Sequence, residues 1–322
     1  MSNFYCPECY AYCEDTPRGY SSWCSHHPRE FGESPERGVL YFLSAGGKRG
    51  GKHAVQLATS LWSLRESGAW SGAVHLMCAD DAASEVGTHL KKADPLLTTQ
   101  DVRYDQKRVR CYSAKTWLGD WSPFKLTVYL DADTVVRGDI KELWPLHNEI
   151  VFTRFCEWSA GDPKSRIINS RIKKWAEYAP ATVRMALTMP RPAINTGVVG
   201  FSRDTTFFEP WKNLCARCPK MFLGDETAAQ VLLAVEQEWR CVDSRFNRSG
   251  WLESDKADDT RIWHLHGGKV LTSKCAPLWL PHFRAASAVN YAGINDWYPK
   301  YFPELAERMA KEKDSEKAGV PC

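Results

Sequence analysis

The sequence lacks the long apolar run that would place it in a membrane. Its 322 residues contain no uninterrupted apolar stretch of the roughly 18 residues that a transmembrane helix needs. The segment from Met1 to Tyr10 also lacks the basic region and apolar core of a signal peptide. From these absences we expect a soluble, cytoplasmic protein with reduced thiols.

An excess of charge of one sign is also lacking. The 42 Lys and Arg residues nearly balance the 39 Asp and Glu residues, which leaves a net charge of +3. A balanced charge does not indicate nucleic acid or an acidic membrane surface as a partner. There is no internal repeat and no low-complexity tract. The 43% of hydrophobic residues and 12% of aromatic residues favour a folded globule.

The sequence does have an alternation of strand and helix patterns, which begins at Val39. It predicts strands over 39–43, 73–79, 101–104, 126–130, 149–155 and 263–266, and helices over 54–66, 81–92, 167–178 and 225–236. This alternation is typical of an α/β fold with a mostly parallel central sheet covered by helices on both faces. We expect a Cys/His-rich N-terminal extension over 1–37, a main domain over 38–290 and a charged C-terminal tail over 291–322.

Two aspartates one residue apart follow the strand predicted over 126–130. Residues i and i+2 of an extended backbone point to the same face, so the carboxylates of Asp131 and Asp133 can converge at the end of this strand. In open α/β sheets, ligands bind at that edge. Two oxygen ligands suit Mg²⁺ or Mn²⁺, and such a cation can hold a phosphate. We therefore expect a divalent metal at this pair.

The segments around this pair resemble a known family. YLDADTVV over 129–136, followed by IKELW over 140–144, resembles the Asp-x-Asp region of GT-A glycosyltransferases. The resemblance is strongest to glycosyltransferase family eight, the glycogenin and lipopolysaccharide galactosyltransferase group. NTGVVGF over 195–201, GDET over 224–227 and HLHGGK over 264–269 follow in the family's order. The resemblance spans about residues 39–285 and implies a GT-A type, Rossmann-like catalytic domain that binds a nucleotide sugar.

By this resemblance, Asp131 and Asp133 would bind a divalent metal carried on the diphosphate of a nucleotide-sugar donor, and Ala132 between them would belong to the donor-binding segment. His264 would be the third metal ligand, and His266 is the alternative because it lies in the same segment. An imidazole beside two carboxylates favours Mn²⁺ over Mg²⁺.

The resemblance also places the donor phosphates near the late glycine segment, where Gly267 and Lys269 would contact them, Lys269 as a point charge. The chain departs from the family here. The usual lysine lies three residues after the glycine, whereas Lys269 lies two residues after Gly267. Lys274 is the alternative cation.

The donor sugar would contact Asn195, Thr196 and Gly197, which offer an amide and a close approach to the backbone. Asp225 and Glu226, at the start of a predicted helix, would lie beside the same sugar. Together with Asn195 they are the expected catalytic residues. The family resemblance carries this assignment, since acids at a helix start also complement the helix macrodipole.

Two other parts of the chain are expected to contact the nucleotide. Lys115 lies where related GT-A enzymes place a basic residue near the nucleotide or sugar. A Gly-rich basic segment, 46–52, follows the first predicted strand, and Ser44 and Gly46 are the expected contacts there. Backbone amides of such a loop can cradle phosphate, although the segment lacks the Gly-Lys-Ser/Thr ending of a P-loop.

These residues together predict a metal-dependent glycosyltransferase. It would move a sugar from a nucleotide-diphosphate donor, a UDP-sugar by resemblance, to a hydroxyl of a glycan, lipid or protein, and the resemblance implies retention of configuration. A haloacid-dehalogenase-like phosphatase is the alternative, because its motif is also a strand followed by Asp-x-Asp. Thr134 stands where that family has Gly, and Ala229 breaks its late Gly-Asp-x-x-x-Asp motif.

The N-terminal extension contains a cluster of metal-binding residue types. Cys6 and Cys9 have the spacing of a zinc knuckle, and Cys24 with either His26 or Cys13 would complete four ligands. The second half of the cluster is not a Cys-x₂-Cys pair. A third, non-enzymatic interpretation makes residues 1–37 a zinc module that binds protein or nucleic acid, with the rest of the chain as a scaffold.

The N-terminal cluster predicts tightly bound zinc that is distinct from an exchangeable cation at the aspartate pair. Thiolates prefer zinc, whereas carboxylates prefer a harder ion. Metal analysis of reduced protein kept free of chelator should find about one zinc per chain. Deletion of residues 1–35 should remove the zinc and leave donor binding intact. Well below one zinc per chain in the full-length protein would contradict this prediction.

Overall fold

The structure is a computed structural model that describes residues 3–5, 12–16, 19–22, 36–102, 104, 111–156, 163–188, 192–217, 224–253, 258–266 and 269–317. Cys6, Cys9, Cys24 and His26, which are the predicted zinc ligands, lie outside the described residues, as does Gly267. The alternative ligand Cys13 lies on β2 (Tyr12–Thr16). This strand pairs with β1 (Asn3–Tyr5) and β3 (Gly19–Ser22) in a small antiparallel sheet.

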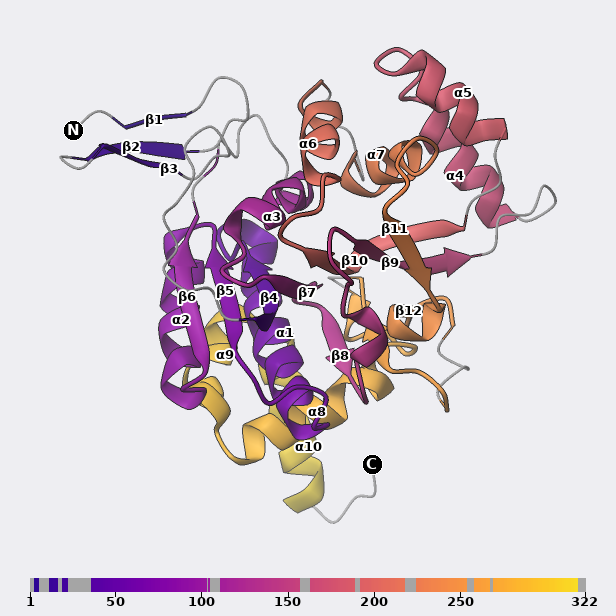
Figure 1. The fold of residues 1–322 in the computed structure, drawn as a ribbon. Helices are drawn as coiled ribbons and strands as arrows, with labels where there is room; N and C mark the ends of the chain where they lie inside the picture. The colour runs from indigo at the N-terminus through magenta and orange to yellow at the C-terminus, as the bar shows by residue number, and fades with distance from the viewer. Residues whose placement is uncertain are drawn as a thin grey trace.

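Seven strands form the central sheet, in the order β11-β9-β10-β7-β4-β5-β6 (Figure 1). They are β4 (Arg37–Leu43), β5 (Val74–Cys78), β6 (Leu97–Asp101), β7 (Leu126–Leu130), β9 (Ile150–Cys156), β10 (Ala193–Ser202) and β11 (Trp239–Val242). β10 runs antiparallel to its neighbours β7 and β9, and the other pairs are parallel. The predicted α/β fold with a mostly parallel sheet is confirmed.

Helices cover both faces of this sheet because its strands are apolar on both faces. In β4, every residue after Arg37 is buried. The side chains of Val39, Tyr41 and Leu43 lie in one hydrophobic cluster, and those of Leu40 and Phe42 lie in the other. A near-continuous apolar run is what a strand requires when helices pack on both of its faces.

The two faces carry different helices (Figure 1). The first cluster includes side chains of α1 (Gly47–Glu66), α2 (Asp81–Ala93), α8 (Ala276–Ala288), α9 (Ile294–Tyr301) and α10 (Pro303–Lys317). The second includes side chains of α3 (Leu118–Trp121), α4 (Pro163–Lys173), α5 (Pro180–Thr188), α6 (Phe208–Arg217) and α7 (Gly224–Leu232). Among the described helices, none is both long enough and apolar enough to cross a membrane.

A second, three-stranded sheet lies beside the end of β7 and brings late residues of the chain to the aspartate pair. Its order is β12 (Arg248–Ser249), β13 (Ile262–His264) and β8 (Thr134–Val136). β13 runs antiparallel to β8, and His264 pairs with Thr134. Short 3₁₀ segments connect the larger elements: η1 (Cys111–Trp117), η2 (Lys141–Leu143), η3 (Ser244–Phe246) and η5 (Tyr291–Gly293).

The Gly-rich basic segment 46–52 is helical rather than the expected loop, since α1 begins at Gly47. Tertiary contacts explain its glycines. A Cβ atom on Gly50 would lie 2.2 Å from the backbone of Ala45, and one on Gly51 would lie 2.7 Å from the carbonyl oxygen of Tyr301. The glycines therefore allow the start of α1 to pack closely against the preceding turn and against the end of α9.

Residues 291–317, within the expected C-terminal tail over 291–322, form η5, α9 and α10. α9 packs against α1. Ile294, Phe302 and Leu305 are at most 1% exposed and belong to the first hydrophobic cluster. The charged residues of α10 dominate its sequence and suggest a tail, whereas a few apolar residues before and within it pack into the core.

This packing predicts a large stability loss when an apolar residue near the C-terminus is truncated. Phe302→Ala should lower the free energy of unfolding by about 3–5 kcal/mol, because it leaves a cavity in the core. Leu146→Ala is the control, since Leu146 is 72% exposed, and it should change stability by less than about 0.5 kcal/mol. Urea denaturation measures both, and equally small effects would contradict the placement of residues 294–305 in the core.

Candidate active site

The two aspartates follow β7, which lies between β4 and β10 near the middle of the central sheet. The backbone N–H of Asp131 donates to the carbonyl oxygen of Gly197 at 2.8 Å. Asp133 lies in the turn that leads into β8, and its carbonyl oxygen accepts from the N–H of Leu265 at 2.9 Å. Both aspartates are thus fixed by backbone contacts to segments that lie far from them in the sequence.

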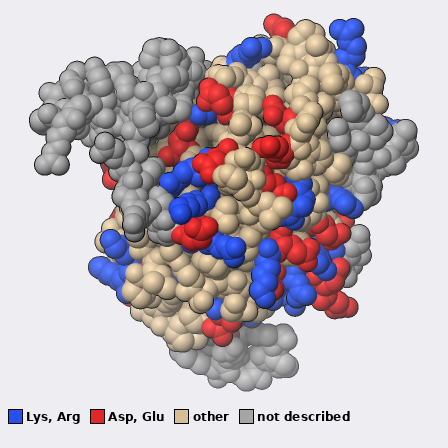
Figure 2. Space-filling model, viewed as in Figure 1, with Lys and Arg blue, Asp and Glu red and all other residues tan. Residues whose placement is uncertain are grey.

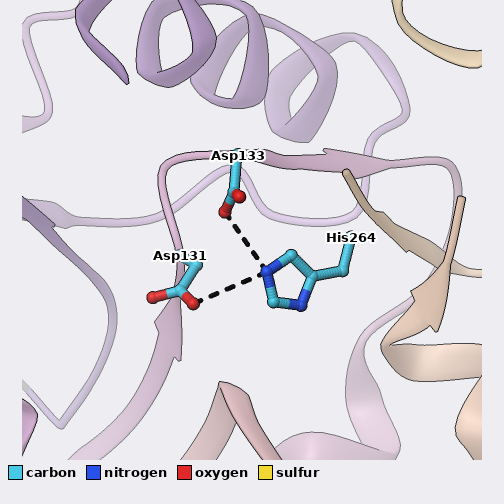
Figure 3. A group of neighbouring side chains, drawn as sticks. All are labelled: Asp131, Asp133 and His264. Atoms are coloured by element: carbon cyan, nitrogen blue, oxygen red, sulfur yellow. Dashed lines mark ion pairs between the residues drawn. The ribbon is translucent and has the colours of Figure 1, made fainter. Parts of the chain in front are cut away.

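His264 completes a group of three candidate metal ligands with these aspartates (Figure 3). Its Nε2 atom lies 3.3 Å from Asp133 Oδ1 and 3.7 Å from Asp131 Oδ2. One ligand atom from each residue can be chosen so that all three lie within 4.8 Å of one another. Two carboxylates and an imidazole around one point form a donor set that suits a divalent cation such as Mn²⁺.

His266 does not join this group, although its ring stacks on that of His264 at a centroid distance of 4.4 Å. Its Nε2 atom lies 2.7 Å from the hydroxyl of Ser249. Burial, together with neighbouring His264, lowers the pKa of His266 to about 3, so its ring stays neutral. Burial alone would also lower the pKa of His264, but the carboxylates of Asp133 and Asp131 outweigh it and raise that pKa.

Lys115, in η1, is a buried cation that joins two of the site's carboxylates. Its Nζ atom lies 2.8 Å from Asp131 Oδ2 and 3.8 Å from Asp225 Oδ2, and it also donates to the carbonyl oxygen of Thr196 at 3.4 Å. Burial would lower the pKa of Lys115, but the two aspartates outweigh it and raise the pKa. The ammonium group therefore keeps its charge in the buried site.

The Asn195-Thr196-Gly197 segment lies at an irregularity of β10, where its register with β9 shifts between Asn195 and Val199. Such a bulge re-aims side chains at the edge of a site. The Gly197 position leaves no room for a side chain, because an added Cβ would lie 2.5 Å from the ring of His264. Glycine here lets the ring of His264, a candidate metal ligand, pack against the sheet.

Asp225 and Glu226 lie in the first turn of α7 and face this bulge. The hydroxyl of Thr196 donates to Asp225 Oδ2 at 2.8 Å, and the amide nitrogen of Asn195 donates to Glu226 Oε2 at 3.0 Å. Burial, together with neighbouring Asp225, raises the pKa of Glu226 to about 7, although Arg171 opposes this. Burial also raises the pKa of Asp225.

Most of these side chains line one cleft of about 580 Å³, although Asp133 is not among its lining residues. Its lining consists of Lys115, Asp131, Phe155, Arg171, Asn195, Thr196, Gly197, Asp225, Glu226, Ser249, Trp251, Leu252, His264, His266 and Lys269. Figure 2 shows acidic and basic side chains interspersed in the middle of the face seen in Figure 1. Most residues that the sequence singles out thus share one cavity.

Several predicted contacts differ from expectation. Ser44 and Gly46 do not line the cleft: the Ser44 hydroxyl and the Gly46 N–H each donate to Asp80 Oδ2 at 3.0 Å. Lys269 lines the cleft, but its Nζ atom lies over the ring of Trp251, 4.3 Å from the centroid. The alternative Lys274 lies over the same ring at 5.5 Å. Ala132 packs against the first hydrophobic cluster.

Several residues outside the predicted set also lie at the site. Asn247 contacts His264, and Arg171 lies 3.4 Å from Glu226 Oε1. The hydroxyl of Tyr129 donates to Asp131 Oδ1. The contact of Tyr129 could have been predicted from the sequence, because Tyr129 lies two residues before Asp131 and residues i and i+2 of a strand share a face. Asn247 and Arg171 lie in segments without a recognisable motif.

No protein-family model and no curated protein matches this chain, but solved structures do. A galactosyltransferase, LgtC, solved with donor and acceptor sugar analogues, is 14% identical with a TM-score of 0.53, over 80% of this chain and 95% of that one. An active-site mutant of LgtC is 16% identical with a TM-score of 0.54, over 78% of this chain and 95% of that one. The glycosyltransferase GlyE of Streptococcus pneumoniae TIGR4 is 15% identical with a TM-score of 0.51, over 83% of this chain and 64% of that one. The chain has the GT-A fold of these glycosyltransferases.

The pKa of Glu226 predicts how stability depends on pH. Because the folded-state pKa of about 7 lies above the ordinary value of 4.5, the buried carboxylate destabilises the fold increasingly as pH rises from 4.5 through 7. Glu226→Gln should therefore gain about 1–3 kcal/mol over the wild type at about pH 8.5 and nearly nothing at about pH 4.5. Urea unfolding with a chelator present measures this, and Glu177→Gln, at an exposed position, is the control. A gain that does not depend on pH would contradict the prediction.

Proposed function

We propose that this chain is a metal-dependent glycosyltransferase. It moves a sugar from a nucleotide-diphosphate donor to a hydroxyl of an acceptor glycan, lipid or protein, and the family resemblance implies that the donor is a UDP-sugar. The observation that carries the proposal is the convergence of Asp131, Asp133 and His264 on one point at a cleft. The GT-A fold and the donor and acceptor sugar analogues bound to LgtC support it.

The donor set supports a metal role for these residues. Asp131, Asp133 and His264 come from the end of β7, the following turn and β13, and their side chains point toward one another in Figure 3. The imidazole favours Mn²⁺ over Mg²⁺. When bound, the cation would neutralise the negative charge that develops on the diphosphate as the glycosidic bond breaks.

The chain's own cations would assist the departure of the diphosphate. Lys115 keeps its charge between Asp131 and Asp225, so a fixed positive group stands beside the proposed metal ligands. Lys269, which lines the cleft, would turn from the Trp251 ring to the phosphates. A preorganised charge of this kind stabilises a transition state without reorganising when the reaction occurs.

Asn195, Asp225 and Glu226 would orient the donor sugar, because their amide and carboxyl groups line the same cleft as Lys115. Carboxylate oxygens accept from sugar hydroxyls and the amide can do both. During transfer the bond between the sugar and the diphosphate breaks, a bond to the acceptor oxygen forms, and the acceptor hydroxyl gives up a proton. Glu226, with a pKa of about 7, is suited to accept that proton. We propose retention of configuration from the family resemblance.

A phosphatase reaction would require one aspartate to attack phosphorus as a nucleophile. Both carboxylate oxygens of Asp131 accept hydrogen bonds, Oδ1 from the hydroxyl of Tyr129 and Oδ2 from the ammonium of Lys115, and these contacts hold the carboxylate in place and reduce its nucleophilicity. This arrangement favours a fixed ligand over a nucleophile. It therefore supports the glycosyltransferase over the haloacid-dehalogenase-like alternative.

The proposal is tested by incubating the protein with a panel of nucleotide sugars and measuring release of the nucleoside diphosphate, with Mn²⁺ and with a chelator. We expect release with at least one UDP-sugar that depends on Mn²⁺ and that Asp133→Ala abolishes. A phosphate ester is tested in parallel. Hydrolysis of the ester without turnover of any nucleotide sugar would overturn the proposal in favour of the phosphatase.

The two histidines should differ in their effect on metal dependence. His264→Ala should raise the Mn²⁺ concentration needed for half-maximal donor hydrolysis about 10-fold or more, because Nε2 of His264 faces both carboxylates. His266→Ala should raise it much less, since Ser249 already engages its Nε2. A Mn²⁺ titration of the rate checks the ranking, and the reverse order would move the ligand to His266.

A further inference from the structure

Asn247 is a buried residue, 5% exposed, that lies between η3 and β12 and links three separate segments. Its Nδ2 atom donates to Thr153 Oγ1 at 2.7 Å and to Asn195 Oδ1 at 2.8 Å. Its Oδ1 atom lies 3.0 Å from Nδ1 of His264. Both ends of the amide therefore have partners, and one end contacts a candidate metal ligand.

The direction of these hydrogen bonds follows from the backbone N–H of Gly197, which can only donate, and from the contacts of the Thr153 hydroxyl. The backbone N–H of Gly197 donates to Asn195 Oδ1 at 2.7 Å, so this oxygen is an acceptor. The hydroxyl of Thr153 directs its single hydrogen to backbone carbonyl oxygens, those of Asn195 at 3.2 Å and Val198 at 3.4 Å. Its oxygen can then only accept from Asn247. Two acceptors facing one end of the Asn247 amide require that end to be the NH₂ group.

The other end of the amide must then be the oxygen, and it faces His264. An amide oxygen accepts only, so Nδ1 of His264 carries a proton. In a neutral imidazole the second nitrogen then has a free lone pair. That nitrogen is Nε2, which points toward Asp133 and Asp131 (Figure 3). The reversed amide would set oxygen against two acceptors in a buried site, where unpaired polar groups are costly.

We propose, on the basis of the proposed function, that Asn247 is a positioning residue that holds His264 in the tautomer whose Nε2 binds the metal. The same residue ties the metal ligand to the sugar side of the cleft, because Asn195 in turn donates to Glu226 Oε2 at 3.0 Å. The chain of hydrogen bonds thus runs in one direction from His264 through Asn247 and Asn195 to Glu226. Groups that orient a metal-bound imidazole in this way raise metal affinity.

A double-mutant cycle on Mn²⁺ binding tests whether Asn247 acts through His264. Electron paramagnetic resonance of free Mn²⁺ gives the dissociation constant without requiring turnover. Asn247→Leu, which keeps the size of the side chain and removes both polar ends, should weaken Mn²⁺ binding about 10- to 100-fold. In the His264→Ala background the same change should have almost no effect, because its target is gone. Asn213→Leu, at an exposed position of α6, is the matched control.

The outcomes separate this inference from the proposed function. If the wild type binds Mn²⁺ and Asn247→Leu either leaves the affinity unchanged or lowers it equally in both backgrounds, the positioning role is overturned and the metal site stands. If the wild type, like Asp133→Ala, does not bind Mn²⁺, both proposals are overturned. Thermal unfolding of each variant in chelator shows whether the fold persists.

A second measurement uses the wild-type protein and so does not depend on how the variants fold. Nitrogen-15 spectra of the histidine rings, recorded with the diamagnetic ion Mg²⁺ bound and assigned with His264→Ala, report which ring nitrogen carries hydrogen. We expect the proton of His264 on Nδ1, with the Nε2 resonance moving on metal addition. A proton on Nε2 in the metal-loaded protein would overturn the assignment of Asn247.

Discussion

The pairing of β13 with β8 is the contact on which the rest of the site depends. It sets His264 opposite Thr134, one residue after Asp133, while the N–H of Leu265 donates to the Asp133 carbonyl oxygen. Without this pairing, the two aspartates would be an acidic turn at the end of a strand, which is a common feature of α/β proteins. With it, an imidazole nitrogen joins two carboxylates at the edge of the sheet where ligands bind.

Burial makes this arrangement costly for the folded state, and the site contains the groups that offset the cost. Lys115 lies between Asp131 and Asp225 and remains charged. Glu226 pairs with the guanidinium of Arg171 at 3.4 Å, but burial and neighbouring Asp225 outweigh this contact and raise its pKa to about 7. Carboxylates held together in this way favour a cation between them. Their burial lowers the stability of the fold, which is a common cost of a functional site.

Much of this site was predictable because its residues follow local rules. The apolar run 126–130 has the bounds of β7, and the period of a strand places Asp131 and Asp133 together at its end. The resemblance in motif order then adds the segments that line the cleft. Two things were not predictable. The glycines at 50 and 51 pack against Ala45 and Tyr301, which local composition cannot reveal. Asn247 depends on partners from three segments, and no motif marks it.

The central claim, that a divalent cation sits between Asp131, Asp133 and His264 and carries the donor diphosphate, is tested most directly by crystallography. Crystals grown with Mn²⁺ and the nucleoside diphosphate identified from the donor panel would be measured for anomalous scattering from manganese. The account predicts one strong anomalous peak in contact with Asp133, His264 Nε2 and oxygens of the diphosphate. A bound diphosphate with no manganese at these residues, or manganese bound elsewhere in the cleft, would contradict it.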